Sequence, residues 1–395
     1  MKISFSSFSI YRVINAMLIF TCIVTAIIVP NDIYNIKKIS LFILLLMNAI
    51  LIIKEAPKNN IILMFGILFP VITTLISFIL SDATVFEIVS KSYPAFYLLL
   101  ALIIRHYRIH YKRIILFALK IISLIVVIST VLDLIGLISI YNNNILMFLK
   151  ENKSAKVGKA SAYIALGYMV FIQSSPLLLY LLGHSIKTKS FIWLVISLIA
   201  IFFSASRALW IVAAIEVFVV LQTDKDKKSR SYRYLLTTLI IIIILIALPN
   251  IIEVVQNSFV LKESGDIVRS GHLVSVKNEI LESPISLIFG HGYADYFYSV
   301  GSRKIVNVVE LSYWDLLRQI GLFGFIPFMI FVLYPIKKTF HNNTMICVVY
   351  IGYLIVAYTN PLLYTSTAFV MFILVYDAYY DISKDVDVGK EKLIE

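Results

Sequence analysis

The chain alternates long apolar runs with short polar segments over almost its whole length. Runs such as IILMFGILFPVITTLISFIL at 61–80 have no polar face to present to water. A helix needs about 20 consecutive apolar residues to cross the hydrocarbon core of a bilayer. The pattern therefore predicts an all-α polytopic membrane protein with about twelve transmembrane helices. The predicted spans are 10–29, 39–53, 61–80, 89–104, 114–140, 160–182, 190–203, 207–222, 234–250, 309–334, 343–358 and 360–378.

Composition excludes a soluble enzyme. Of the 395 residues, 60% are hydrophobic and only 15% are charged, and the mean hydropathy is +0.91. The first apolar run ends in VPND without a small-residue cleavage site, so we expect a retained span rather than a signal peptide. The sequence contains no P-loop, dinucleotide fingerprint, nucleophile elbow or metal-ligand spacing. We therefore expect neither a cofactor nor a metal.

Basic residues account for the net charge of +12 and indicate an orientation. Lys and Arg gather mainly in segments that share a side with the N-terminus, as in RHYRIHYKR at 105–113 and DKDKKSRSYR at 224–233. Because such residues accumulate on the cytoplasmic side, both termini are predicted to be cytoplasmic in a multi-pass membrane protein. The clusters then face anionic lipid, and no nucleic-acid partner is expected.

The longest polar segment, residues 250–308, separates predicted spans nine and ten and lies on the periplasmic or extracellular side. Long loops in compact proteins are more often functional than accidental. Within this loop, DIVRSGHLVSVKNEILESP predicts a short amphipathic helix that carries Arg269 and His272 on one face and stops at Pro284. The alternative is an ordinary solvated helix that lies on the membrane surface.

Two turns follow this helix. FGHGY at 289–293 predicts a tight turn around His291, and GSRK at 301–304 adds Arg303.

The hairpin FFSASRALW at 202–210 joins predicted spans seven and eight on the same side. We expect Ser206 to cap the eighth helix. Arg207 would then stand at the helix end where a cation is unfavourable, which makes better sense if an anion binds there. The alternative is an arginine that reaches the lipid headgroups.

A third polar cluster opens span ten, in VVELSYWDLLRQIGLFG at 308–324. Asp315 and Arg318 are three residues apart on the predicted helix and are expected to pair. Glu310 has no local partner. A carboxylate at the rim of a water-filled cavity is a candidate general base. The alternative is an interfacial glutamate that caps the first turn.

The order of these motifs resembles the O-antigen polymerase and ligase superfamily over about residues 200–335. The matching positions are Ser204, Ser206 and Arg207, then Arg269, Pro284, Gly290 and Gly292, then Glu310, Tyr313, Gly321 and Gly324. Ligases typically show His-Asn where this chain has Glu310-Leu311, so the resemblance favours the polysaccharide polymerases. An aromatic residue is common a few positions after the loop arginine, where this chain has His272 and Leu273.

The resemblance implies a GT-C-like, metal-independent glycosyltransferase formed by residues 1–395 as one integral membrane domain. On the outer face of a bacterial inner membrane, it would polymerise undecaprenyl-pyrophosphate-linked repeat units into the O-antigen of lipopolysaccharide or into capsular polysaccharide. Arg207 and Arg269 would stabilise the leaving diphosphate, and Glu310 would prepare the acceptor hydroxyl. Further substrate contacts are expected from Arg303, Arg318, His272, His291 and Tyr313. The implied partners are lipid-linked glycans, membrane lipid and a chain-length regulator.

Two other functions stay open at this point. A ligase would transfer glycan to a lipid or protein acceptor, and a flippase or other transporter would move lipid-linked oligosaccharide without chemistry. A transporter should place its charges along a central path through the membrane. Here the charged candidates gather on the outer side.

Overall fold

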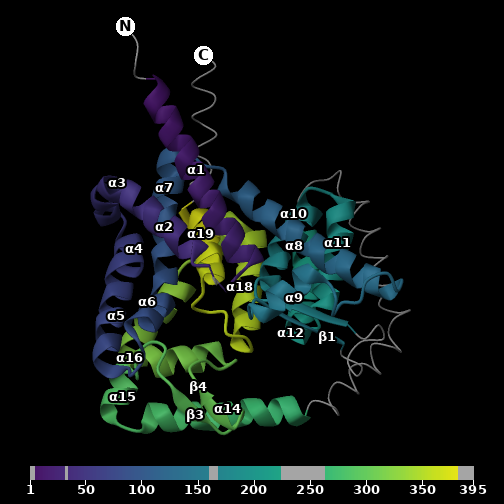
Figure 1. Ribbon diagram of the computed structural model, residues 1–395. Helices are drawn as coiled ribbons and strands as arrows, with labels where there is room; N and C mark the ends of the chain where they lie inside the picture. The colour runs from purple at the N-terminus through teal and green to yellow at the C-terminus, as the bar shows by residue number, and fades with distance from the viewer. Residues whose placement is uncertain (1–4, 32–33, 160–167, 224–262, 381–395) are drawn as a thin grey trace. The chain divides into compact units, whose positions relative to one another are not determined.

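A computed structural model describes residues 5–31, 34–159, 168–223 and 263–380 (Figure 1). The chain divides into two parts, each with its own internal contacts. Unit 1 comprises Met1–Ala118, Val268–Asn342 and Ala357–Glu395, and unit 2 comprises Leu119–Ile267 and Asn343–Val356. Predicted span 234–250 lies outside the described residues.

Unit 1 is built mainly from helices. These are α1 (Phe5–Ile28), α2 (Ile36–Met47), α3 (Ala49–Glu55), α4 (Asn60–Leu63), α5 (Phe69–Leu80), α6 (Val85–Ser92), α7 (Leu100–Tyr107), most of α14 (Glu263–Leu281), α15 (Pro284–Phe289), α16 (Ser312–Leu333), α17 (Ile336–Asn342) and α19 (Ser366–Tyr380). Strands β3 (Phe297–Ser299) and β4 (Lys304–Val306) form an antiparallel hairpin in which Tyr298 lies opposite Ile305.

Unit 2 contains shorter elements. Its helices are α9 (Asn144–Glu151), α10 (Leu178–Lys187), α11 (Phe191–Phe203) and α12 (Arg207–Thr223), and its strands are β1 (Ala155–Lys159) and β2 (Tyr168–Ile172). Helices α8 (Tyr111–Leu134), α14 and α18 (Thr344–Tyr358) run from one unit into the other.

Five helical stretches are long and apolar enough to cross a membrane among the described residues. They are Ile10–Ile28, Asn60–Leu80, Val85–Tyr107, Tyr111–Leu134 and Ser312–Asn342. The pair Ile36–Met47 and Ala49–Lys58, bent by 70°, is a sixth candidate, and α11, α18 and α19 are apolar but shorter. A helical membrane protein is therefore supported, while the number of about twelve spans stays a prediction.

Residues 160–182 do not form the single helix that their apolar character predicted. In the described part of this run, YMVFI at 168–172 is strand β2, which pairs with β1, and α10 begins only at Leu178. Aromatic and β-branched residues favour strands, and Pro176 occupies the short turn before the helix. That part of the prediction was wrong because a short apolar run does not distinguish a buried strand from a helix.

A break in α16 fixes how the neighbouring turn packs. Gly321 adopts φ 58° and ψ −176° inside this helix, a conformation that is essentially restricted to glycine. At the break, the carbonyls of Arg318 and Gln319 accept hydrogen bonds from the N–H groups of His291 and Gly292, both at 2.9 Å. The turn around His291 is thereby docked onto the middle of α16.

A small apolar core joins α14, the β3–β4 hairpin and the start of α16. Its buried members are Val276, Ile280, Phe297, Val309 and Leu311. Where α14 crosses the hairpin turn, a Cβ on Gly271 would lie 2.6 Å from the Cα of Gly301, so the two backbones are in direct contact. This core holds the functional candidates of α14 beside those of α16.

Candidate functional site

The structure brings Arg269 and Glu310 together, although they are 41 residues apart in sequence. Arg269 projects from α14, and Glu310 immediately precedes the first turn of α16. Its Oε2 lies 3.4 Å from Arg269 Nε, and the two side chains are 29% and 35% exposed. A pair this exposed contributes only about 0.2–1 kcal/mol. A more highly charged anion can therefore compete for the arginine.

His272 lies one helical turn beyond Arg269 on the same face of α14, as the sequence pattern predicted. Its ring is buried, and Nδ1 is hydrogen-bonded to the hydroxyl of Ser299 in β3. Burial lowers the pKa of the imidazole, and the nearby Glu310 carboxylate opposes that shift. A neutral imidazole at pH 7 follows, so His272 positions the hairpin and adds no cation to the site.

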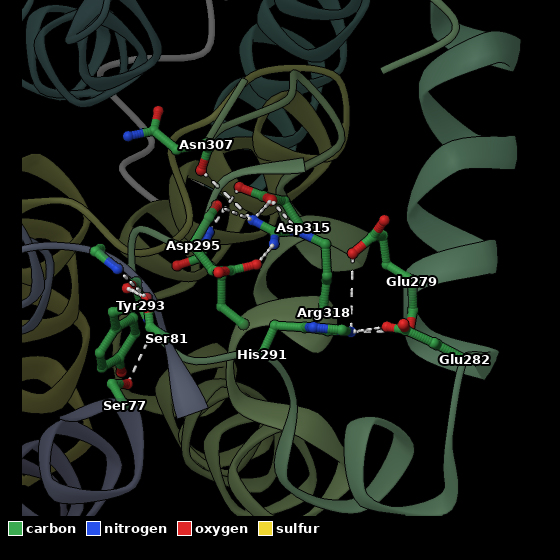
Figure 2. Close-up of polar contacts among 12 residues, drawn as sticks. Ser77, Ser81, Glu279, Glu282, His291, Tyr293, Asp295, Asn307, Asp315 and Arg318 are labelled. Atoms are coloured by element: carbon green, nitrogen blue, oxygen red, sulfur yellow. Dashed lines mark hydrogen bonds and ion pairs between the residues drawn. The ribbon is translucent and has the colours of Figure 1, made fainter. Parts of the chain in front are cut away.

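Arg318 is fully buried and holds two acidic side chains around it (Figure 2). The predicted pair with Asp315 is present at 3.2 Å, and a second ion pair joins Arg318 to Asp295 at 3.4 Å. The guanidinium also lies 4.2 Å from the ring centre of Phe297. Arg318 was expected to contact phosphate or glycan. Its position inside this network instead links the β3–β4 region to α16 through ion pairs.

The carboxyl group of Asp295 is buried in this network. Burial raises its pKa, while the Arg318 guanidinium lowers it. The carbonyl oxygens of Asp295 and Asn307 also accept hydrogen bonds from Arg318, at 3.4 and 3.5 Å. These contacts fix the two ends of the β3–β4 hairpin relative to the first half of α16.

His291 faces α14 rather than an open cavity (Figure 2). Its Nε2 is hydrogen-bonded to the backbone carbonyl of Glu279 at 2.9 Å and lies 3.9 and 3.7 Å from the carboxylates of Glu279 and Glu282. Burial raises the pKa of Glu279, and His291 opposes the shift. The predicted tight turn is thus present, and its histidine ties the turn to the end of α14.

Three side chains near this turn have the geometry of possible metal ligands. One ligand atom each from Glu279, His291 and Asp295 lies within 4.8 Å of the others. Carboxylate oxygen and imidazole nitrogen suit several divalent ions. His291 Nε2 already hydrogen-bonds a carbonyl, however, so a metal would have to use Nδ1 or displace that bond.

Tyr293 anchors the same turn to α5, a contact that local sequence patterns do not reveal (Figure 2). Its N–H donates to Ser77 Oγ at 2.8 Å, its carbonyl accepts from Ser81 Oγ at 3.1 Å, and its hydroxyl donates to Thr73 at 3.2 Å. Burial raises the pKa of Tyr293 to about 12. Thr73 and Ser77 share one face of α5, but this spacing alone does not identify Tyr293 as their hydrogen-bond partner.

The remaining predicted residues are Arg303 and Tyr313 in unit 1 and Arg207 in unit 2. Arg303 is exposed in the β3–β4 turn with φ 53°, and the ring of Tyr313 lies 6.1 Å from that of Tyr358. Arg207 begins α12 in unit 2, where Ser206 Oγ accepts from the N–H of Leu209 at 3.4 Å. The predicted cap is therefore confirmed. Within unit 1, the structure gathers Arg269, His272 and Glu310.

No protein-family model, curated protein or solved structure matches the chain. The function therefore has to be argued from the residues of the site. These residues are the partly exposed Arg269 and Glu310, which stand next to the apolar core of α14, the β3–β4 hairpin and α16.

Proposed function

We propose that the chain is a glycosyltransferase that polymerises undecaprenyl-pyrophosphate-linked oligosaccharide repeat units. The reaction would take place on the outer face of a bacterial inner membrane and yield O-antigen or capsular polysaccharide. The observation that carries the proposal is the partly exposed Arg269–Glu310 pair, which places a cation and a carboxylate 3.4 Å apart beside a candidate membrane span.

The reaction requires two functions that this pair supplies. A hydroxyl at the non-reducing end of one lipid-linked unit attacks the anomeric carbon of the growing glycan, and the bond from that carbon to the diphosphate breaks. Glu310 accepts the hydroxyl proton as a general base. Arg269 stabilises the negative charge that develops on the departing diphosphate through charge-assisted hydrogen bonds.

The weakness of the pair is compatible with this exchange of partners. The hydrogen bond from Arg269 Nε to Glu310 is long, at 3.4 Å, whereas a diphosphate offers several oxygens and more charge. When the diphosphate takes the guanidinium, the carboxylate is left next to the acceptor hydroxyl. Arg207 enters the proposal through its motif position and through the helix end on which it stands.

The buried contacts behind the pair serve as its frame. The Arg318 ion pairs and the Tyr293 anchor hold the loop that precedes Glu310, while the apolar core holds α14. A rigid support is what a catalytic pair needs, because misplacement by about 1 Å can cost 10²-fold in rate.

Surface polysaccharide in the source bacterium tests the proposal. Glu310→Gln, Arg269→Gln and Arg207→Gln are each expected to leave single repeat units at the surface in place of long chains, with Lys187→Gln, at an exposed position of α10, as a control that keeps the chains. Membrane levels of each variant are compared by immunoblot. Unchanged long chains in all three variants would refute the assignment. Polymer that is made but left unattached would indicate a ligase, and repeat units retained inside the cell would indicate a flippase.

A further inference from the structure

A cavity of about 270 Å³ lies within unit 1, at the turn between α7 and α8. Its walls are apolar and come from segments far apart in sequence, namely Ile61, Leu98, Leu102 and Ile373. Its rim is basic and is formed by Arg105, Arg108, His110, Lys112 and Arg113. The site is therefore amphipathic, with an apolar interior beneath a cationic edge.

The cavity lies at the opposite end of the helical bundle from the candidate catalytic pair. Lys112 forms an ion pair with Asp377, near the C-terminal end of α19. That end of α19 contacts α17, since Asn342 Nδ2 donates to the carbonyl of Ala378 at 3.0 Å. Because Ser312–Asn342 is one candidate span whose first residue adjoins the catalytic pair, the cavity belongs to the other membrane boundary.

The basic rim coincides with the ends of two candidate spans. Val85–Tyr107 ends and Tyr111–Leu134 begins there, so the rim residues stand where the chain leaves the apolar region. Phospholipid phosphates occupy this depth in a bilayer, and basic pockets between helices bind anionic headgroups.

The charges of the rim are only partly compensated by the protein. Lys112 is paired with Asp377, whereas the exposed side chains of Arg105, Arg108 and Arg113 make no ion pair or hydrogen bond within the part of the chain that the structure describes. Arg113 also lies in the first turn of α8, where the helix dipole disfavours a cation. An anion bound between the arginines would relieve both effects.

Arg108 stands at the C-terminal end of α7. This residue ends α7 with φ 52°, the left-handed conformation usually left to glycine. The N–H of Ile109 donates to the carbonyl of Ile104 at 3.0 Å, which completes a Schellman-type helix end. Arg108 lines the cavity from this helix end.

We propose that this cavity binds the phosphate headgroup of an anionic phospholipid, with the arginines on the phosphate and the first acyl carbons between the apolar walls. Charge complementarity supports the anion, and the apolar walls favour a lipid over a free phosphate, which has nothing to place against them. The inference does not depend on the proposed glycosyltransferase activity.

Thermal unfolding of the full-length protein in an uncharged detergent tests this inference. Phosphatidylglycerol is expected to raise the unfolding temperature of the wild type in a saturable manner, while phosphatidylcholine and glycerol 3-phosphate are not. The triple variant R105Q/R108Q/R113Q should bind phosphatidylglycerol at least about tenfold more weakly. A matched triple variant at exposed lysines outside the cavity, K54Q/K187Q/K337Q, should bind it as the wild type does.

A second variant keeps the test independent of charge. Ala101 lines the cavity, and Ala101→Trp fills it without altering the arginines, so it should also weaken the lipid effect. An equal response of the wild type and both cavity variants to phosphatidylglycerol would overturn the proposal. A response to glycerol 3-phosphate as large as that to the lipid would also overturn it, in favour of a soluble phosphate.

Discussion

Gly290 and Gly321 lie so close together that a Cβ atom on either one would come within 2.6 Å of the other's backbone nitrogen. This contact joins the turn around His291 to the break in α16. Both glycines also have positive φ angles, of 78° and 58°. The orientation of the first half of α16, and therefore of the segment that carries Glu310, depends on this contact.

We expect Gly321→Ala to destabilise the protein. A side chain at this φ and ψ is strained by about 1–3 kcal/mol, and the clash with Gly290 adds to that cost. The unfolding temperature in detergent measures the effect. Gly158→Ala is the matched control, because its Cβ would meet only one methionine methyl group at 4.0 Å. Equal unfolding temperatures for the two variants would contradict the role of the break.

Arg318→Met is expected to cost about 3–5 kcal/mol, because it leaves two buried carboxylates without their cation. The triple variant D295N/D315N/R318M should recover part of this loss. Arg303→Met, at an exposed turn position, is the control for removal of an arginine. If R318M unfolds at the same temperature as R303M, the ion pairs of Arg318 do not stabilise the fold.

Stability should fall as the pH drops through the region below about 6.5, the usual pKa of histidine. Burial lowers the pKa of His272 in the folded protein, so the unfolded chain takes up the proton first and acid favours unfolding. His272→Gln retains a hydrogen-bonding group for Ser299 and removes the titration. The unfolding temperature of this variant should therefore change less between pH 7.5 and about pH 5.5. If the unfolding temperature of His272→Gln falls with pH as much as that of the wild type, another group causes the pH dependence.

Much of the local structure could be predicted from the sequence, because it depends on short-range spacing. The Asp315–Arg318 pair follows from an i, i+3 separation, the Ser206 cap from its place before a helix, and the shared face of Arg269 and His272 from helical periodicity. Each of these involves residues within one turn of helix.

Contacts between distant segments could not be predicted in this way. Asp295 joins Arg318 only because the Gly290 turn folds back on α16, and nothing in the local pattern around Asp295 names its partner. The pairing of β1 with β2 was missed because the apolar second strand has the composition of a helix. The neighbourhood of Arg269 and Glu310 could be expected, whereas their direct contact required the fold.

For stability, we expect a positive charge at position 269 to be sufficient. For activity, we expect the guanidinium group itself to be required. Arg269→Lys keeps the exposed ion pair, so its unfolding temperature should equal that of the wild type. Because lysine cannot make two parallel hydrogen bonds to a diphosphate, polymer synthesis should still fall, by about tenfold or more. Chain-length profiles on gels measure this, with Lys304→Arg as a control at a neighbouring exposed cation. A fully active Arg269→Lys protein would limit the arginine to a simple electrostatic role.

The most direct test uses the purified full-length protein in lipid vesicles with a lipid-linked repeat unit from the source bacterium. The wild type is expected to convert this single substrate into a ladder of longer glycans and to release undecaprenyl pyrophosphate. Glu310→Gln should lower that rate by about 10²–10⁴-fold while its unfolding temperature stays unchanged. Ladder formation by Glu310→Gln at the wild-type rate, or no ladder from the wild type with its own repeat unit, would contradict the account.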